Sequence, residues 1–408
     1  MKKLRLLLLL ALIATLAMPV VTLAQGDDDD DEDDQPLIGF WEECEEPDAL
    51  SGTIDVGVVF SLSGAASVYG ATQQNGVMLA MDEINESGYL GEAELNLVIE
   101  DGGSDPDAAI AAMDKLVNED EVVAVIGPTL SSQAFSADPI AQEAGIPVMG
   151  VSNTATGITD MGDFVFRDSL PEASVIPGNL GQAVEILGIE RVGVMYSDND
   201  DFSVSGYNVF TQTLEELGVE VVGEETFQIG DTSFEAQLSN LVLEDIDALI
   251  VSTLAAEASL IVEQARALEF SGPIIGGNGF NTPAIVTNAG EAADGVIVGA
   301  AWHITSPTDI NTSFVEMYEE ANESSPDQFA AQSYTGTWLM ATAIRCANSS
   351  DSAAIRDALA EIEEFDSPLG LFSFDEDRNP VQEPVAQIIV DGTFEILTED
   401  TAEAAFGE

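Results

Sequence analysis

The strongest constraint on the fold of this chain is a regular alternation of apolar and amphipathic segments that begins near residue 54. The apolar segments are short and end in small or polar loop residues, which is typical of buried strands. The first four of them cover residues 54–60, 95–100, 122–126 and 147–150. A longer amphipathic segment opens with Asp105 and Pro106, a common helix start. Such alternation over short loops predicts an α/β fold, in which helices cover both faces of a parallel sheet.

A second series of the same kind starts near Pro171 and predicts a second sheet with its own core. Its expected strands cover residues 191–196, 220–227, 248–252, 273–276 and 295–300. Helices are expected later at 310–321, 328–347 and 352–363, with short strands at 371–374 and 385–390. These late elements are too few to fold alone, so we expect them to complete the two earlier sheets.

The predicted architecture is therefore two doubly wound parallel-sheet lobes joined by a hinge that the chain crosses several times. We assign residues 53–170 and 299–374 to lobe 1, and residues 171–298 and 375–400 to lobe 2. Ligands of such folds bind in a cleft at the carboxyl ends of the strands, and we expect this cleft to lie between the lobes.

The first 24 residues have the pattern of a signal peptide. A basic start (1–5) precedes an apolar run (6–17) and a small residue, Ala24. The alternative is a membrane anchor, but the run is short for a membrane span. We expect an exported protein, in the periplasm or at the outer face of the cytoplasmic membrane, with no direct membrane insertion after cleavage.

Residues 25–52 are predicted to form an acidic, disordered leader, because residues 27–34 are all acidic and like charges at this density do not pack. The whole chain carries 75 acidic and 10 basic residues, a formal net charge of −65. Such a chain repels nucleic acid and anionic lipid, so neither is expected as a partner. Adaptation to a saline exterior and a composition without functional role are both compatible with this charge.

The chain contains two cysteines, Cys44 and Cys346. In an exported protein a disulfide between them is plausible and would tie the leader to a late helix. The alternative is two free thiols, since the sequence does not reveal whether the geometry allows a bridge.

Nothing in the sequence predicts catalysis. The single histidine, His303, has no nucleophile or metal-ligand cluster in its vicinity, and a structural role suits it best. The chain has no GxSxG elbow, no phosphate-binding loop and no spaced His/Cys set. We therefore expect a protein that is not an enzyme and that uses no cofactor or metal.

Small hydroxyl residues follow the predicted strands of lobe 1 and suggest a binding site. Ser131, after the strand at 122–126, opens a helix whose free N–H groups suit a carboxylate, although it can also be a plain helix cap. Ser152 and Thr154 follow the next strand and either receive an ammonium or form an ordinary polar turn. Ser63 and Tyr69 follow the first strand, where Tyr69 either walls the cleft or covers a loop.

Several segments together resemble the branched-chain amino-acid binding proteins of ABC importers, which have the type I periplasmic binding protein fold. They are Val-Gly-Val-Val-Phe-Ser-Leu-Ser-Gly at 56–64, Ala-Met-Asp-Glu-Ile-Asn at 80–85, Val-Ile-Gly-Pro-Thr-Leu-Ser-Ser at 125–132, Ala-Gly-Ile-Pro-Val at 144–148 and Gln-Ser-Tyr at 332–334. The resemblance covers residues 53–397. It implies two lobes that close around an amino acid, branched-chain or otherwise neutral, and deliver it to a membrane permease.

Carried over by position, the resemblance gives roles to individual residues. Ser131 matches the residue that takes the ligand carboxylate, and Ser152 and Thr154 match those that meet carboxylate and ammonium. Lobe 2 contributes Phe202, where the family often has tyrosine, and Leu254, near another lining position.

Asn278 stands where the family has the acid that balances the ligand ammonium. An amide brings no charge, so either a nearby acid compensates or the ligand is not a plain amino acid. A sensory module for amides, urea-like solutes or small carboxylates is the alternative function.

Overall fold

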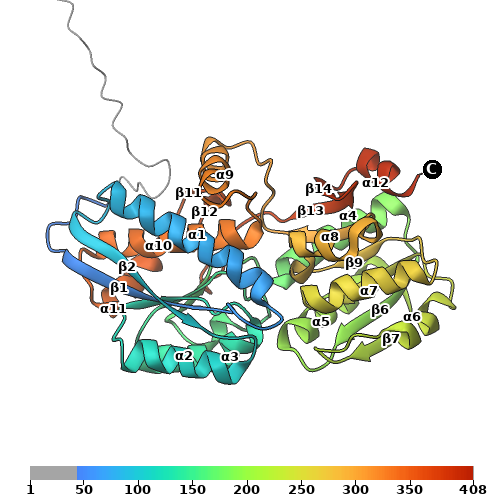
Figure 1. The fold of residues 1–408 in the computed structure, drawn as a ribbon, viewed down its shortest axis with the longest axis horizontal. Helices are drawn as coiled ribbons and strands as arrows, with labels where there is room; N and C mark the ends of the chain where they lie inside the picture. The colour runs from blue at the N-terminus through green and yellow to red at the C-terminus, as the bar shows by residue number, and fades with distance from the viewer. Residues whose placement is uncertain (1–43, 408) are drawn as a thin grey trace, which may run out of the picture. The chain divides into compact units, whose positions relative to one another are not determined.

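The computed structural model describes residues 44–407. The predicted signal peptide (1–24) and the part of the predicted leader up to residue 43 lie outside the described residues. The prediction of disorder is wrong for residues 44–52, because Cys44 forms a disulfide, Leu50 is buried in the core of lobe 1 and β1 already starts at Ser51. All described residues belong to one compact unit, in which two large sheets form the centres of two lobes (Figure 1). Within residues 44–407, no helix has both the length and the apolar character needed to cross a bilayer.

Lobe 1 is built on a parallel sheet with the strand order β2-β1-β3-β4-β5. The strands are β1 (Ser51–Phe60), β2 (Glu92–Asp101), β3 (Ala124–Ile126), β4 (Val148–Gly150) and β5 (Val165–Arg167). Side chains alternate along β1, so that Val58 and Val59 enter different cores on opposite faces of the sheet. Both faces are buried, as is usual for a parallel sheet.

Helices cover both faces of this sheet. One face packs against α1 (Ser67–Glu86), α9 (Asp309–Asn322), α10 (Gln328–Ala347) and α11 (Ser352–Leu359), and the other against α2 (Pro106–Asn118) and α3 (Ser131–Ala144). The hairpin of β11 (Phe365–Ser367) and β12 (Gly370–Phe372) completes the first core. Trp338 and Tyr334 of α10 are fully buried in that core, so this late helix is its central element.

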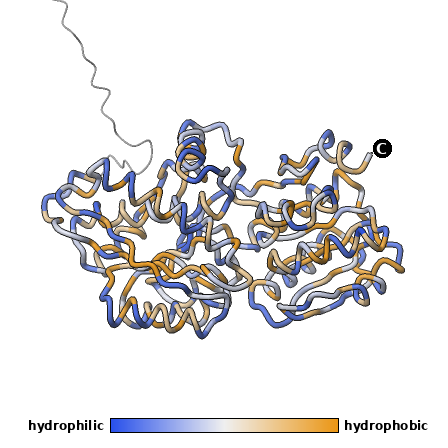
Figure 2. Tube along the Cα trace, in the orientation of Figure 1, coloured by the Kyte–Doolittle hydropathy of each residue, from blue (hydrophilic) through white to orange (hydrophobic). Residues whose placement is uncertain are grey.

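Lobe 2 is built on a seven-stranded sheet with the order β14-β13-β10-β9-β8-β6-β7. Its parallel strands are β6 (Arg191–Ser197), β7 (Glu220–Phe227), β8 (Ala248–Ser252), β9 (Ile274–Gly276) and β10 (Val296–Ala300). One face packs against α4 (Glu172–Leu187), α5 (Asp201–Leu217) and α12 (Glu399–Phe406), and the other against α6 (Glu235–Val242), α7 (Ala255–Ala267) and α8 (Pro283–Ala289). Figure 2 shows hydrophobic stretches along the strands inside both lobes.

One edge of this second sheet differs from the expectation of parallel strands throughout. β13 (Val385–Val390) runs antiparallel to β10, and β14 (Thr393–Ile396) runs antiparallel to β13. Asp391 and Gly392 join them with positive φ angles of 49° and 74°, which is the geometry that a tight two-residue hairpin requires. No crossover helix separates these two strands, so they cannot run parallel.

Within the described residues the chain passes between the lobes after β5, after β10 and before β13. The last passage starts later than the expected boundary at residue 375. Arg378 donates from Nε to the carbonyl of Val165 (3.1 Å), and Arg167 donates from Nε to Asn379 Oδ1 (2.7 Å), so these residues still belong to lobe 1. Likewise all of β10 lies in the second sheet, so the passage expected at 299 begins after Ala300.

Cys44 and Cys346 form a disulfide, with their Cα atoms 4.9 Å apart, within the usual range for such bridges. It ties the first described residues to the end of α10. Arg345 stabilises the same corner by donating from Nη1 to the carbonyl of Tyr89 (2.7 Å) while its guanidinium lies over the Tyr89 ring. This bridge belongs to lobe 1.

Candidate functional site

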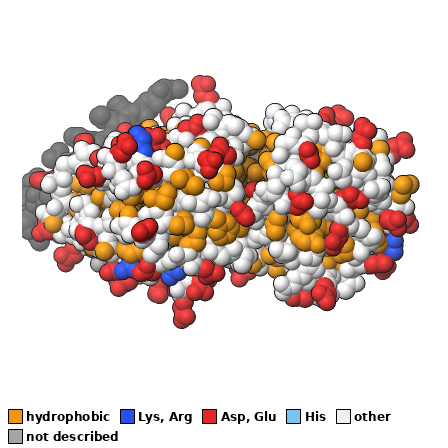
Figure 3. Space-filling view, turned by 90° about the horizontal axis from the view of Figure 1, so that it is seen from below, with side chains coloured by type: hydrophobic (Ala, Val, Ile, Leu, Met, Phe, Trp, Pro, Cys, Tyr) orange, Lys and Arg blue, Asp and Glu red, His pale blue; other side chains and the backbone are white. Residues whose placement is uncertain are grey.

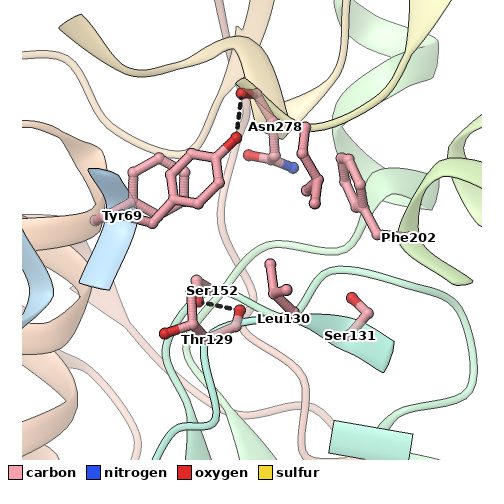
Figure 4. A pocket seen from close by; sticks show the side chains of 10 residues that line it. Tyr69, Thr129, Leu130, Ser131, Ser152, Phe202 and Asn278 are labelled. Carbon is pink, nitrogen blue, oxygen red and sulfur yellow. Dashed lines mark hydrogen bonds between the residues drawn. The ribbon is translucent and has the colours of Figure 1, made fainter. Parts of the chain in front are cut away.

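A small cavity lies where the two lobes meet (Figure 4). Lobe 1 lines it with Tyr69, Thr129, Leu130, Ser131, Ser152 and Phe329, and lobe 2 with Phe202, Leu254, Asn278 and Gly279. Its open volume is about 20 Å³, which is room for little more than one water molecule. The lobes are therefore closed on each other, and a ligand of amino-acid size enters only when they part.

The start of α3 forms the floor of the cavity in lobe 1. Gln133 fixes this start, because its Oε1 accepts the N–H of Leu130 (3.0 Å). The first N–H groups of a helix have no partner inside the helix and carry its positive dipole end. Ser131 adds a hydroxyl that accepts the N–H of Ala155 (3.2 Å), so its own hydrogen remains to be donated. The start of α3 thus offers donors to an anionic head group. Ser132, in its first turn, is near the buried carboxyl of Asp200, whose pKa is raised by burial.

Ser152 also lines the cavity, but its hydroxyl is engaged by the protein. It accepts from Gln73 Nε2 (2.8 Å) and donates to the carbonyl of Thr129 (2.6 Å). The hydroxyl of Thr129 in turn donates to Gln73 Oε1 (2.7 Å). Ser152 therefore holds the loop that precedes Ser131 in place.

The structure does not bring Thr154 and Ser63 into the cavity lining. Thr154 is buried, and its hydroxyl lies near the carboxyl of Glu172. Ser63 is exposed on a loop, where its N–H donates to Asp101 Oδ1 (3.2 Å) and its carbonyl accepts from Ser104 (2.8 Å). Both residues follow strands as expected, but their side chains are directed elsewhere.

Tyr69 reaches from lobe 1 into lobe 2 and connects the two. Its hydroxyl donates to the carbonyl of Gly279 (2.7 Å) and accepts the N–H of Ala255 (2.7 Å). Burial, together with the nearby acids Glu257 and Asp200, raises the pKa of Tyr69 well above its usual range. The phenol therefore stays protonated and keeps its hydrogen for Gly279.

The wall from lobe 2 is mainly apolar. Phe202 lies in the first turn of α5, and Leu254 directly precedes α7, so both side chains stand at helix starts that face lobe 1. Gly279 packs closely between them: an added Cβ would lie 2.4 Å from the carbonyl of Thr253 and 3.0 Å from the Phe202 ring. Only glycine leaves room for the Thr253 carbonyl and the Phe202 ring at this position.

Asn278 is the polar group that lobe 2 presents to the cavity. Its backbone N–H donates to Glu172 Oε1 (3.0 Å), and its Oδ1 accepts from Gln328 Nε2 (3.0 Å). Its Nδ2 has no hydrogen-bond partner although the residue is only 2% exposed. Figure 4 shows the amide at the edge of the cavity, with the nitrogen turned toward Phe202.

Glu172, the first residue of α4, lies behind Asn278 and does not line the cavity. Burial raises its pKa to about 7, against the opposing effect of the N–H and side chain of Asn278 and of the Thr154 hydroxyl. The Asn278 side chain is near, but Glu172 Oε2 and Asn278 Nδ2 form no hydrogen bond. Glu172 is the nearby acid that the sequence left open as compensation for Asn278.

Sequence reasoning missed Glu172, and also Thr129, Leu130, Gly279 and Phe329. Thr129 and Leu130 precede Ser131, and Gly279 follows Asn278, so adjacency to predicted residues is a usable signal for these three. No such signal marks Glu172 among 75 acidic residues.

His303 lies in a second, larger cavity of about 330 Å³, which Trp302, Asp327 and Phe394 also line. Its ring nitrogens contact the Thr305 hydroxyl (2.8 Å) and the carbonyl of Phe394 (3.2 Å). Burial lowers its pKa, so the ring is neutral at pH 7. Among the described residues, no group of His, Cys, Asp and Glu side chains is arranged to hold a metal ion.

Comparison with known proteins identifies what this architecture resembles. The model of the family described as "Periplasmic binding protein" matches residues 53–393. The Leucine-, isoleucine-, valine-, threonine-, and alanine-binding protein of Pseudomonas aeruginosa is 24% identical over 324 residues, which cover 79% of this chain and 86% of that protein.

Two solved structures are similar across both lobes. A leucine binding protein, LivK, from Thermotoga maritima superposes with a TM-score of 0.81 at 28% identity, covering 85% of this chain and 98% of the other. The branched-chain amino acid transporter substrate binding protein LivJ from Streptococcus pneumoniae, in complex with isoleucine, gives a TM-score of 0.80 at 30% identity, with 84% and 98% covered.

Proposed function

The chain belongs to the periplasmic binding protein family, and from that premise we propose that it is the extracytoplasmic solute-binding protein of an ABC importer. It binds a small solute, a branched-chain or other neutral amino acid, between its lobes and delivers it to a membrane permease. The observation that supports this most is the start of α3 with the Ser131 hydroxyl, set against an apolar wall from lobe 2.

The two sides of the cavity suit the two ends of such a solute. The carboxylate lies at the N-terminus of α3, where backbone N–H groups and Ser131 donate to it. The apolar body of the solute packs against Leu130, Phe202 and Leu254. No basic side chain lines the cavity, so neutral donors hold the anion.

Closure couples binding to delivery. A solute that contacts both lobes favours the closed arrangement by its differential affinity for it. Tyr69 adds two hydrogen bonds that exist only when the lobes meet. The permease then distinguishes the closed, loaded protein from the open one.

The experiment is a calorimetric titration and thermal-shift series on the mature chain without residues 1–24. Leucine, isoleucine, valine, alanine and threonine are the test solutes, and glutamate and lysine are the controls. We expect saturable binding and a raised Tm with at least one neutral amino acid and none with the charged controls, because a solute that binds only the native state stabilises it. Failure of every neutral amino acid and of its 2-oxo and 2-hydroxy analogues would refute the proposal.

A further inference from the structure

Three carbonyls of residues that line the cavity accept hydrogen bonds from the protein itself. The carbonyl of Thr129 accepts from Ser152, that of Gly279 accepts from Tyr69, and that of Leu130 accepts the N–H of Ala134 within α3 (3.0 Å). Each of these three carbonyls is therefore already engaged by the protein.

The groups that remain are donors. They are the first N–H groups of α3, the hydrogen of the Ser131 hydroxyl and the Nδ2 of Asn278. Asn278 Nδ2 is buried and makes no hydrogen bond, although the Glu172 carboxyl is near its side chain, so an acceptor on a ligand would satisfy it. Lobe 1 and lobe 2 thus each present donors to the same small space.

The orientation of the Asn278 amide is fixed by a chain of hydrogen bonds that starts outside the cavity. Gln328 Oε1 accepts from the backbone N–H of Ala301 (2.6 Å) and from Asn281 Nδ2 (2.8 Å). The Nε2 of Gln328 must then be the side that faces Asn278, and it donates to Oδ1. A flipped Asn278 would set two NH₂ groups against each other, so its own NH₂ group stays toward the cavity.

A ligand ammonium in this place would meet a donor instead of an acceptor. Glu172 is near the Asn278 side chain but does not line the cavity, and its Oε1 already accepts the backbone N–H of Asn278. Asp200, which is near Ser132, does not line the cavity either, and its Oδ2 accepts from the N–H and the hydroxyl of Ser203. A carbonyl or hydroxyl oxygen at the same position of the ligand would accept from Asn278 Nδ2 and satisfy it.

We propose that this site prefers small carboxylates whose second polar group is a hydrogen-bond acceptor, namely 2-oxo and 2-hydroxy acids with an apolar body, over the matching α-amino acids. The proposal rests on the proposed function, because it assumes that the solute binds between the lobes with its carboxylate at α3. It assigns Asn278, held by Gln328, as the residue that determines this preference.

The test compares three solutes with one carbon skeleton on the mature chain: leucine, 4-methyl-2-oxopentanoate and 2-hydroxy-4-methylpentanoate. We expect calorimetry to show the oxo or hydroxy acid binding about 10-fold or more tightly than leucine. The leucine ammonium would face the Asn278 NH₂ group and would lack the charge-assisted hydrogen bond that an acceptor could give it. Equal or tighter binding of leucine would overturn the proposal and leave the proposed function intact. Binding of none of the three would count against both.

The variant Asn278→Asp provides a second, opposite readout. Asp is nearly isosteric, its Oδ1 can still accept from Gln328, and its second oxygen places an acceptor in the cavity. We expect it to reverse the order of affinities in favour of leucine. Because the new carboxylate lies near Glu172, the comparison is repeated in the background Glu172→Gln, which keeps the local charge constant. An unchanged order in both backgrounds would contradict the role of Asn278.

The single variant Glu172→Gln tests the remaining explanation, in which Glu172 itself accepts the ligand ammonium. If Glu172 accepts the ligand ammonium, loss of the Glu172 carboxylate weakens the binding of leucine by 10-fold or more and leaves the binding of the oxo acid unchanged. This result would overturn the proposal. If Asn278 determines the preference, the ratio of the leucine affinity to the oxo-acid affinity in this variant stays within about twofold of the wild-type ratio. These ratios compare ligands on one protein, so a general loss of stability does not mimic either outcome.

Discussion

The two lobes share a fold but contribute different chemistry to the cavity between them. Lobe 1 presents a helix start and hydroxyl groups, whereas lobe 2 presents Phe202, Leu254 and a single amide, Asn278. A solute can therefore be anchored by one lobe and selected by the other: lobe 1 holds the head group that all candidate solutes have in common. The other meets the part in which they differ.

The scarcity of basic residues explains why lobe 1 uses neutral donors for the head group. Beyond residue 5 only seven basic residues remain, one lysine and six arginines. Arg167, for example, is buried and uses its Nη1 on the carbonyls of Asn153 (3.2 Å) and Ala155 (2.8 Å). Figure 3 shows acidic side chains over both lobes on one face, with few basic ones among them. With bases this scarce, neutral donors are the available means of holding an anion.

The largest expected effect concerns the disulfide, which belongs to lobe 1. The double variant Cys44→Ser/Cys346→Ser should lower the free energy of unfolding by roughly 4 kcal/mol, because the bridge closes a long loop in the unfolded chain. The two cysteines are 302 residues apart. Urea unfolding measures the loss, and calorimetry should show an unchanged ligand affinity. A change in affinity without a change in stability would show that the bridge controls the cavity instead of supporting lobe 1.

The next effect concerns Glu172, the buried acid behind Asn278. Its folded pKa of about 7 lies above an unfolded value of about 4.3. Between these values the folded state retains a proton that the unfolded state has lost, so stability falls as pH rises from about 4 to about 7. The full loss is roughly 3 kcal/mol.

The variant Glu172→Gln removes this titration. Its stability advantage over the wild type should therefore grow by roughly 3 kcal/mol from pH 4 to pH 8, as unfolding at several pH values would measure. Glu185, an exposed acid farther along α4, is the control, and Glu185→Gln should show no such trend. A pH-independent difference for Glu172→Gln would disprove this account.

The contact between the lobes depends on Tyr69. Tyr69→Phe removes one donor and one acceptor from groups that are buried when the lobes close, so we expect a cost of roughly 2 kcal/mol to closure. Ligand affinity should fall about 30-fold, since closure and binding are linked. Tyr207→Phe, which removes a hydroxyl that donates to Glu224 on the surface of lobe 2 (3.0 Å), should bind normally. Normal binding by Tyr69→Phe would mean that the two bonds do not drive closure.

The smallest expected effect is that of a single hydroxyl in lobe 1. Ser131→Ala leaves the α3 start in place and removes one donor, so calorimetry should show an affinity about fivefold lower, or about 1 kcal/mol. Ser63→Ala, on the exposed loop, should have no effect. If the two variants behave alike, the carboxylate does not lie at α3.

Elements with strong local patterns could be predicted from the sequence, and weakly patterned ones could not. The range 328–347 predicted for a helix is that of α10, and 385–390 is that of β13. By contrast β5 and β14 have three and four residues. Such short strands have no periodicity of their own and form only because a sheet edge is available to pair with. The start of α3 at Ser131 was predicted because a helix start depends on adjacent residues.

Two α/β lobes, the order of their elements and the hydroxyl residues after the strands of lobe 1 can be derived from the amino-acid sequence. The roles of these residues depend on contacts that form only in the folded protein. Thr154 turns toward Glu172, Tyr69 joins Gly279 from 210 positions away, and Gln328 sets the polarity of Asn278 from 50 positions away. Periodicity is a local property of the chain. The partner that consumes a donor or an acceptor is brought there by the fold.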